Sequence, residues 1–339
     1  MTVHIAMVGL GYWGPNLARN LGATIGARLH TLCDARRDLL EKFASQYPSA
    51  ATTNEYTQVL ANPDVHAVVL ATPVQTHFEL ASAALRAGKH VLVEKPLAQT
   101  VKQGAALVSL AREHRRILMC GHVFLYSPPV RMVKQLIDGG TLGKVLHVYS
   151  QRLNLGVIRQ DVNTLWNVAP HDISILNYWL GAVPLAVQAT AFSYIQPGVE
   201  DVAFATLEYP DRVSAHVHAS WLDPHKVRRM TLIGERKMVV YDDVAADAKV
   251  VVHDKSAKRQ TDGGSAPRVV LTNGDVSIVA VDPTEPLRLE CQHFVDCIAK
   301  GEQPLSDGPE ALRVLETLEA LQESLAAGGV RVPVVHHNE

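Results

Sequence analysis

The chain has 339 residues, a formal net charge of −2 at pH 7 and a hydrophobic content of 47%. Two domains with buried cores fit within this length. Because binding to phosphates needs a basic surface, the charge argues against nucleic acid as a partner. No apolar run is long enough to cross a bilayer, and no secretory signal precedes the first apolar strand. We therefore expect a cytoplasmic protein that does not bind membranes.

Metal ligands are not indicated by the pattern of cysteines and histidines. The cysteines are Cys33, Cys120, Cys291 and Cys297. Their spacing is not that of metal ligands, so we interpret all four as buried thiols in a reducing compartment. His216 and His218 share one strand face, but no third ligand lies at a useful spacing. We expect no metal site.

Apolar strands alternate with helical stretches over the first third of the chain. We predict strands at residues 5–8, 28–33, 67–71, 90–94 and 117–120, and helices that begin near residue 14 and span about 75–87 and 105–114. Short links in a βαβ order are typical of a parallel, doubly wound sheet that is covered on both faces. Residues 1–121 are therefore predicted to form one α/β domain.

The pattern changes to longer strands after residue 121. Between Val213 and Trp221, apolar side chains alternate with Ser and His, which predicts a strand with one buried face. We expect similar strands at 202–209, 229–233 and 238–241, helices at about 130–137, 287–299 and from 309 to before 328, and a surface loop at 254–266. Asn273-Gly274 separates two apolar runs and predicts a hairpin turn. Residues 122–335 are thus predicted to form an α/β domain with an open, mostly antiparallel sheet and helices on one side.

A glycine-rich turn follows the first apolar strand and precedes a helix. Gly9, Gly11 and Gly14 have the Gly-x-Gly-x-x-Gly spacing. In a dinucleotide site the first glycine permits the tight turn, the second lets the backbone approach the pyrophosphate, and the third lets helix and strand pack closely. We predict that this turn, which includes Tyr12 and Trp13, binds a dinucleotide. The alternative is a strand–helix turn without a ligand.

Asp34 lies twenty residues after Gly14, at the end of the second predicted strand. A carboxylate at this place accepts hydrogen bonds from the adenosine ribose and repels a 2′-phosphate, which favours NAD. Arg36 could instead clamp that phosphate, so NADP stays an alternative. The other interpretation of Arg36 is a solvated helix start.

Lys95 follows a buried strand in the sequence Glu94-Lys95-Pro96. Lysine is rare at such a position unless it is paired or functional. Open α/β sheets bind their ligands at the carboxyl ends of the strands, which makes Lys95 a candidate for proton transfer beside a dinucleotide. Its pKa would have to fall by roughly three units from about 10.4. The alternative is an ion pair, and a cis Lys95–Pro96 bond would aim the side chain.

A third segment contains Asn167 and His171. We expect Pro170 to begin a helix and His171 to lie in its first turn, with the amide of Asn167 four residues before it. Such a histidine could face the cofactor crevice, although a lone histidine is more often a surface or core residue.

These motifs resemble, in order and spacing, the Gfo/Idh/MocA oxidoreductase family over nearly the whole chain. They are Gly9-x-Gly11-x-x-Gly14, Ala71-Thr72-Pro73-x-x-x-His77, Glu94-Lys95-Pro96, Asn167-x-x-x-His171 and the closing Glu290-Cys291-Gln292-His293-Phe294 helix. The resemblance implies an N-terminal Rossmann domain, a C-terminal α/β domain with an open sheet, and hydride exchange between NAD(P) and a carbon of a sugar or cyclitol. It also implies that Lys95 transfers the proton with His171 as its partner. Thr72, Pro73, His77 and Glu94 then belong to the cofactor site.

One position departs from the family pattern. Many members have aspartate four residues before the histidine, where this chain has Asn167. An amide can form hydrogen bonds but cannot take a proton. Lys95 and His171 must therefore carry the proton.

Within the family, residues 11–17, 152–159 and 165–174 most resemble the nucleotide-sugar 3-dehydrogenases, which act on UDP-N-acetylglucosamine or its uronic acid. This implies that Arg152, Asn154 and Arg159 bind the substrate, with the arginines at its pyrophosphate or carboxylate. The alternative for the arginines is an exposed basic loop. A free-sugar or inositol dehydrogenase is the second hypothesis, and a catalytically silent NAD(P)-binding regulator is the third. We expect a homodimer or homotetramer joined through the C-terminal sheet, because its apolar alternation suits burial against a partner subunit.

Overall fold

A computed structural model describes residues 2–156, 158–160, 162–260 and 268–337. Contacts between residues divide the chain into two compact units. The first contains Met1–Tyr126 and Thr284–Leu315, and the second contains Ser127–Pro283 and Glu316–Asn338. The sequence does not predict that the segment after residue 283 returns to the first unit.

The first unit is built on a six-stranded parallel sheet in the order β3-β2-β1-β4-β5-β6. The strands are β1 (Val3–Val8), β2 (Ala27–Cys33), β3 (Ala51–Thr53), β4 (Ala67–Leu70), β5 (His90–Glu94) and β6 (Leu118–Gly121). β4 is apolar and buried at every position, as a strand covered on both faces must be. The predicted doubly wound sheet is confirmed.

Helices connect these strands. They are α1 (Gly14–Gly22), α2 (Arg37–Ala44), α3 (Tyr56–Ala61), α4 (Val74–Arg86), α5 (Val101–Glu113) and the short 3-10 helix η1 (Val123–Tyr126). α8 (Pro286–Lys300) also belongs to this unit and packs on α1 and η1. The strand order reverses between β1 and β4, and doubly wound sheets bind their ligands at the carboxyl ends of the strands at such a reversal.

The second unit holds a nine-stranded sheet in the order β14-β13-β12-β11-β7-β10-β9-β8-β15. Its strands are β7 (Val145–Leu153), β8 (Ala186–Phe192), β9 (Val202–Glu208), β10 (Ser214–Ser220), β11 (Val227–Gly234), β12 (Met238–Asp242), β13 (Val250–Gln260), β14 (Arg268–Ile278) and β15 (Val332–Pro333). β7 and β10 pair in parallel, and the other neighbours are antiparallel. This arrangement confirms the predicted open, mostly antiparallel sheet.

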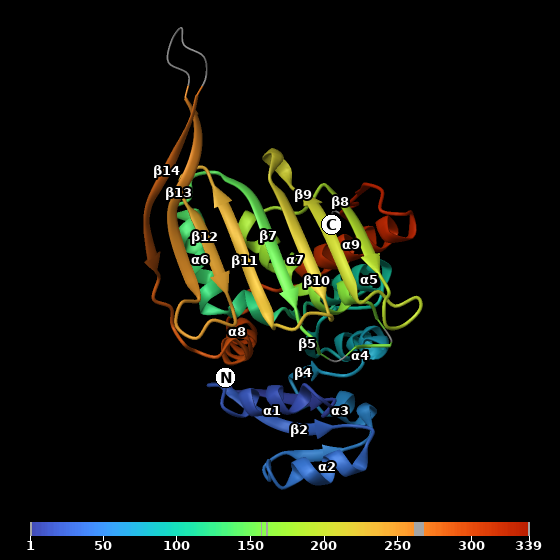
Figure 1. The fold of residues 1–339 in the computed structure, drawn as a ribbon. Coiled ribbons are helices and arrows are strands. Elements are labelled where there is room, and N and C mark those ends of the chain that lie inside the picture. The colour runs from blue at the N-terminus through green and yellow to red at the C-terminus, as the bar shows by residue number, and fades with distance from the viewer. Residues whose placement is uncertain (1, 157, 161, 261–267, 338–339) are drawn as a thin grey trace. The chain divides into compact units, whose positions relative to one another are not determined.

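Helices cover one face of this sheet (Figure 1). α6 (Pro128–Asp138) and α7 (Thr164–Leu180) pack on it, η2 (Pro210–Arg212) links β9 to β10, and α9 (Gly308–Ala326) contributes residues to both units. Along β10, Ala215, Val217 and Ala219 are buried, whereas His216 and His218 alternate with them on the opposite face. None of the helices in the described ranges is long and apolar enough to span a membrane.

Two predictions at the outer edge of the second sheet are wrong. Asn273-Gly274 forms no hairpin turn, because both residues lie inside β14, which pairs with β13. Of the predicted surface loop, residues 254–260 belong to β13, and 261–266 lie outside the described residues. The pairing is irregular between His253 and Lys255, and Gly274 faces this irregularity. A Cβ at Gly274 would lie 2.8 Å from Oδ2 of Asp254. The glycine therefore lets the Asp254 side chain approach the backbone of β14, and it does not form a turn.

Candidate cofactor and active site

The glycine turn joins the end of β1 to the start of α1. Gly9 has a φ of +91°, and a Cβ there would lie 2.6 Å from the carbonyl oxygen of Ala71. A Cβ on Gly14 would collide with the carbonyl oxygen of Gly9. At Gly11, by contrast, the nearest atom to such a Cβ is Nη2 of Arg36, 3.6 Å away. The protein's own packing therefore requires the first and third glycines, whereas a Cβ on the second would make only ordinary van der Waals contact, which leaves room for the approach of a pyrophosphate.

The N-terminus of α1 faces this space without a side-chain cap. Trp13, the residue before the helix, makes no capping hydrogen bond within the described part of the chain, and Pro15 occupies its first turn. Free N–H groups at a helix N-terminus, together with the helix dipole, attract phosphate. Tyr12, inside the turn, is 95% exposed. These features fit the pyrophosphate of a dinucleotide.

Asp34 lies directly after β2 and is held beside the glycine turn. Its Oδ2 accepts a 2.7 Å hydrogen bond from the main-chain N–H of Leu10, and its Oδ1 accepts one of 2.9 Å from the N–H of Arg36. The guanidinium of Arg36 lies 3.5 Å from the same carboxylate, with its side chain 58% exposed. Asp34 is thus fixed where the adenosine ribose of a bound dinucleotide is expected, with Arg36 next to it.

Lys95 follows the last residue of β5, and the Lys95–Pro96 peptide bond is cis. The buried imidazole of His77 connects this position to another loop. Its Nδ1 lies 2.9 Å from the carbonyl oxygen of Pro96, and its Nε2 lies 2.9 Å from that of Thr72. Burial lowers the pKa of His77, which favours the neutral ring with one N–H. A neutral ring donates to only one of these two carbonyl oxygens. His77 therefore lies between the Thr72-Pro73 turn and the Lys95-Pro96 step, and contact of these residues with the cofactor stays a prediction.

Glu94 is the last residue of β5 and directly precedes Lys95. Its Oε2 accepts a hydrogen bond of 3.3 Å from the main-chain N–H of Lys95, and Trp13 of the glycine turn also donates to this carboxylate. The carboxyl group packs on Gly121, where a Cβ would lie 3.0 Å from it. Burial raises the pKa of Glu94 to about 7, although the charge of Lys95 opposes that rise. The carboxylate therefore titrates near neutral pH beside the proposed proton-transfer residue.

Three further titratable residues surround this point and are not predicted from the sequence as site residues. His122 is buried and its Nδ1 lies 2.8 Å from Oε2 of Glu310. Glu290, on α8, is fully buried. The signal that could have found Glu290 is a carboxylate in the apolar face of the closing helix, since glutamate is almost never fully buried unless it is paired.

Asn167 and His171 lie on α7 of the second unit. The prediction that Pro170 begins a helix is wrong: α7 begins at Thr164, and Pro170 lies inside it. The reason is the cap, because the side chain of Asn163 accepts a 3.0 Å hydrogen bond from the N–H of Trp166. Asn167 and His171, four residues apart, share one face of the helix, as the pattern requires.

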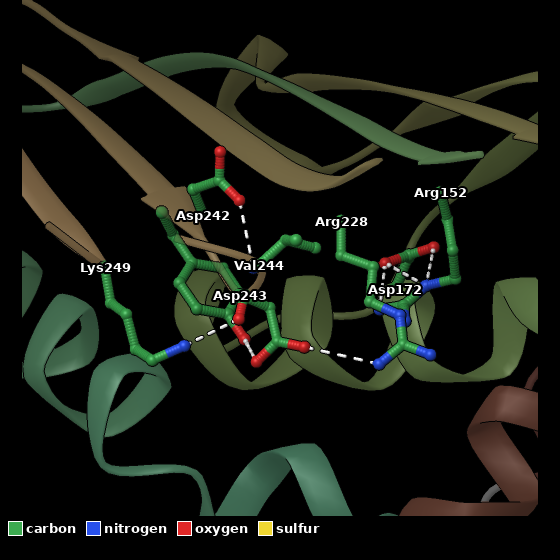
Figure 2. A network of polar contacts seen from close by, with 8 residues as sticks. Arg152, Asp172, Arg228, Asp242, Asp243, Val244 and Lys249 are labelled. Atoms are coloured by element: carbon green, nitrogen blue, oxygen red, sulfur yellow. Dashed lines mark hydrogen bonds and ion pairs between the residues drawn. The ribbon is translucent and has the colours of Figure 1, made fainter. Parts of the chain in front are cut away.

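Arg152, a predicted substrate ligand, pairs with Asp172 in the interior of the second unit. Its Nε and Nη2 donate to the Asp172 carboxylate at 2.9 to 3.2 Å, and both side chains are at least nine-tenths buried. Figure 2 shows the two groups facing each other, with the ion pair between Arg228 and Asp243 beside them. This pair accounts for the burial of Arg152 without a ligand, so its substrate contact stays a prediction.

The other predicted substrate ligands lie at the surface of the second unit. Asn154 and Arg159 are exposed. The main-chain N–H of Asn154 bonds to the carbonyl oxygen of Ser220 at 3.1 Å, and the carbonyl oxygen of Arg159 accepts a bond from Gln196. Lys95 and the glycine turn belong to the first unit, whereas Asn167, His171 and these residues belong to the second.

Metal-binding geometry is absent from the part of the chain that the structure describes, where no cluster of three or more His, Cys, Asp or Glu side chains could hold an ion. His216 and His218 line a shallow hollow of about 510 Å³ on the uncovered face of the second sheet. His216 bonds to Thr206 at 3.0 Å, and His218 stacks on Phe204.

Cys33, Cys120, Cys291 and Cys297 are free and buried, as predicted.

The first unit combines a doubly wound sheet, a glycine turn before a helix without a side-chain cap, a fixed carboxylate after β2 and a lysine after β5. Together these features define an NAD-binding oxidoreductase. Residues 3–122 match the model of the oxidoreductase family with an NAD-binding Rossmann fold, and residues 130–240 match the Gfo/Idh/MocA C-terminal domain. The chain belongs to the Gfo/Idh/MocA family, whose members include sugar and polyol dehydrogenases.

Relatives with assigned substrates differ in what they oxidise. The chain is 24% identical to scyllo-inositol 2-dehydrogenase (NAD(+)) of Bacillus subtilis, over 96% of this chain and 95% of that protein. UDP-N-acetylglucosamine 3-dehydrogenase GnnA from Acidithiobacillus ferrooxidans has a similar structure, with a TM-score of 0.82 and 22% identity over 96% of this chain and 98% of that chain. Scyllo-inositol dehydrogenase from Lactobacillus casei, solved with NAD(H) and scyllo-inositol, has a TM-score of 0.80 and 19% identity over 98% of this chain and 99% of that chain. These structural likenesses establish the fold.

Proposed function

We propose that the protein is an NAD-dependent dehydrogenase that oxidises the C3 hydroxyl of a UDP-linked N-acetylhexosamine or its uronate. The observation that carries the proposal is Lys95, placed directly after β5 in the sheet whose glycine turn is open at Gly11. The 152–159 and 165–174 stretches and the fold shared with a UDP-N-acetylglucosamine 3-dehydrogenase support the nucleotide sugar as the substrate.

The first unit supplies the cofactor site in this proposal. The N–H groups of the glycine turn and the start of α1 hold the pyrophosphate, and Asp34 accepts hydrogen bonds from the adenosine ribose. Bound NAD⁺ supplies the acceptor for the hydride that leaves the sugar carbon. Asp34 favours NAD over NADP because its carboxylate repels a 2′-phosphate.

Lys95 acts as the general base when the sugar is oxidised. The neutral amine takes the proton of the substrate hydroxyl, so that the O–H bond breaks and an Nζ–H bond forms as the carbonyl appears. His171 hydrogen-bonds the same oxygen, and Asn167 orients the substrate without taking a proton. General acid–base help of this kind contributes about 10² to 10⁴ in rate.

A free-sugar or inositol dehydrogenase is the second candidate, favoured by the full-length likeness to the scyllo-inositol enzyme. A screen of UDP-sugars, free sugars and inositols with NAD and NADP, followed by the absorbance of reduced nicotinamide, separates the two. We expect turnover with NAD and a UDP-aminosugar, with UDP as an inhibitor. Turnover with free polyols alone, insensitive to UDP, would reject the nucleotide-sugar substrate.

A catalytically silent NAD(P)-binding regulator is the third candidate. Lys95 and His171 are both retained, which supports an enzyme. The regulator would gain support if Lys95→Ala bound NAD normally and left every measurable function unchanged.

We also propose that the enzyme is a cytoplasmic homodimer or homotetramer joined through the uncovered face of the second sheet. Tyr149 and Phe204 are 40% and 44% exposed on this face, on the two strands β7 and β9 that flank β10, which makes the face apolar enough to be buried. The double variant Tyr149→Arg/Phe204→Glu should sediment as a smaller species than the wild type. An unchanged sedimentation coefficient would reject this interface.

A further inference from the structure

The outermost strand of the second sheet exposes a row of large apolar side chains. β14 lies at the edge of the sheet and is exposed along its whole length. Four of its aliphatic side chains have exposed fractions of 56–74%, and these are Val269, Leu271, Val276 and Ile278. A long apolar edge strand promotes unwanted pairing unless another surface covers it. We call these four side chains the apolar row.

A bulge brings the apolar row to one face of the sheet. Its first two members lie at odd positions and its last two at even positions, so a regular strand would place them on opposite faces. The pairing, however, gives β14 two residues, Gly274 and Asp275, where β13 has only Asp254. This extra residue shifts the alternation by one position. All four side chains therefore point to the same side.

Strand register assigns the apolar row to the uncovered face of the sheet. Side chains of paired residues on neighbouring strands point to the same side. The pairing crosses the sheet from β7 to β14 through Tyr149, Thr231, Val240, Val251 and Ile278. On the opposite face of β13, Val250 and Val252 are buried, and α6 packs on this strand. The apolar row therefore continues the face that contains Tyr149.

The outer part of β13 and β14 extends beyond the neighbouring strand β12 (Figure 1). β12 pairs with β13 only at residues 250–253, whereas residues 255–260 pair with 268–273 of β14 and with no other strand of the described chain. We call these two stretches the outer ribbon. A two-stranded ribbon by itself is marginally stable in water and gains stability by packing on another surface. Because the ribbon extends past its own sheet, another molecule can supply that surface.

Charge favours a second copy of this chain as the partner. In the sequence, residues 255–273 contain four basic side chains and one acidic side chain, whereas the whole chain has a net charge of −2. The rest of the chain therefore carries a surplus of acidic groups, which attracts the ribbon of another copy. A stable interface buries about 800 Å² on each partner, more than four aliphatic side chains expose, so the apolar row needs the adjoining face as well.

We propose that the outer ribbon is an arm that reaches over a second copy of this chain and buries the apolar row against it. The inference rests on the proposed self-association through the uncovered face, and it names the part of each copy that extends this interface. In a two-fold assembly each copy gives one ribbon and receives one. The bulge is essential to this arrangement, because without it Val269 and Leu271 would face away from the partner.

Two substitutions at neighbouring positions test the proposal. Leu271 belongs to the apolar row, whereas Thr272 is exposed on the opposite face of the same strand. Leu271→Glu and Thr272→Glu therefore introduce the same charge on opposite faces. In sedimentation equilibrium of the full chain, the Kd for self-association should rise at least about tenfold in Leu271→Glu and stay within about threefold of the wild type in Thr272→Glu. Because both side chains are exposed in the single chain, circular dichroism should show both variants folded.

Deletion of Gly274 is a second test that leaves every apolar side chain in place. It removes one of the two bulge residues, so Val269 and Leu271 should turn to the opposite face of the sheet. The Kd for self-association should then rise as it does in Leu271→Glu. Association at wild-type strength in a folded deletion variant would show that the face of these side chains does not matter, which would contradict the proposal.

The proposal is overturned if Leu271→Glu and Thr272→Glu self-associate equally well. Failure of the proposed face gives a different result, namely unchanged sedimentation of Tyr149→Arg/Phe204→Glu, so the two failures are distinguishable. A membrane surface is the other occupant that a basic, apolar ribbon could fit. A wild type that stays monomeric and floats with vesicles of anionic lipid, while Leu271→Glu does not, would assign the ribbon to a membrane and overturn the proposal.

Discussion

The main-chain N–H of Leu10 donates a 2.7 Å hydrogen bond to Oδ2 of Asp34, so the glycine turn and the end of β2 share one carboxylate. The same side chain also accepts the N–H of Arg36. Asp34 therefore fixes the shape of the turn, and in the proposed cofactor site it presents a negative charge to the adenosine ribose. The proposed cofactor role and the two observed hydrogen bonds both require an acceptor at the end of the second strand.

Asp34→Ala should raise the Kd for NAD at least about tenfold, equivalent to about 1.4 kcal/mol, because both main-chain donors lose their acceptor. The preference for NAD over NADP should also fall, since Arg36 remains to meet a 2′-phosphate. Fluorescence titration with both cofactors measures the two effects. Asp38→Ala, an exposed carboxylate in the first turn of α2, is the control and should change neither. An unchanged NAD/NADP ratio in Asp34→Ala would contradict the assigned role.

Substitution of Gly11 should weaken cofactor binding, whereas substitution of Gly14 should destabilise the protein. Gly11→Ala places its Cβ in ordinary van der Waals contact with the Arg36 side chain, so the free energy of unfolding should change by less than about 0.5 kcal/mol while NAD affinity falls at least about tenfold. Gly14→Ala drives a Cβ into the carbonyl of Gly9, so the protein itself should be destabilised, by about 2 kcal/mol or more. Urea unfolding and cofactor titration of both variants check this. Equal loss of stability in the two would show that Gly11 is also a packing residue.

The Arg152–Asp172 pair should dominate the stability of the second unit. Asp172→Ala leaves a buried guanidinium without its partner, which costs about 3–5 kcal/mol. The double variant Arg152→Met/Asp172→Leu should recover most of this, because a buried ion pair is often replaceable by apolar side chains. Differential scanning calorimetry measures both. The double variant also tests the substrate role of Arg152: KM should rise in it even when stability is restored, and an unchanged KM would assign Arg152 to structure alone.

His90, the first residue of β5, should make the first unit sensitive to acid. Its Nδ1 accepts a 3.0 Å hydrogen bond from the N–H of Ile117, and burial, followed by the charge of Arg116, lowers its pKa to about 4. Histidine in an unfolded chain titrates near 6.5, so between about pH 6.5 and 4 the unfolded state binds more protons. Stability is then present at neutral pH and lost as the pH falls through this window. We expect the free energy of unfolding to drop by about 1–2 kcal/mol between pH 7 and about pH 5 from this residue.

His90→Asn provides the check, because the amide oxygen can accept the bond from Ile117 and does not titrate. Urea unfolding at the two pH values should show a smaller difference in this variant than in the wild type. His225→Asn, at an exposed position, should keep the wild-type difference. If His90→Asn retained the full pH dependence, the effect would have to come from other groups.

The sequence predicts the first unit well because its signals are local. An apolar strand, the three glycines and Asp34 lie within one βαβ segment, and the Lys-Pro step follows a strand of the same sheet, so spacing alone places them at one end of the sheet. The free, buried cysteines follow from composition in the same way. These features depend on backbone periodicity, which the chain displays directly.

Three features of the structure differ from the sequence-based expectation or are not predicted from the sequence. Pro170 lies inside α7 because the helix begins seven residues earlier, where Asn163 caps it. Gly274 resembles a turn residue but serves an irregular strand pairing. Glu290 reaches its neighbours only because the segment after residue 283 returns to the first unit. The outcomes at Gly274 and Glu290 depend on partners distant in sequence, which local patterns do not contain, whereas the cap at Asn163 is a local signal.

The central claim, that Lys95 takes the proton of the substrate hydroxyl, is tested most directly by comparing turnover and cofactor binding in Lys95→Ala. Removing a general base should lower kcat by at least about 10²-fold, whereas the Kd for NAD should change by less than about threefold. Lys102→Ala, on the exposed surface of α5, should match the wild type in both quantities. Retention of kcat within about tenfold in Lys95→Ala would contradict the assignment.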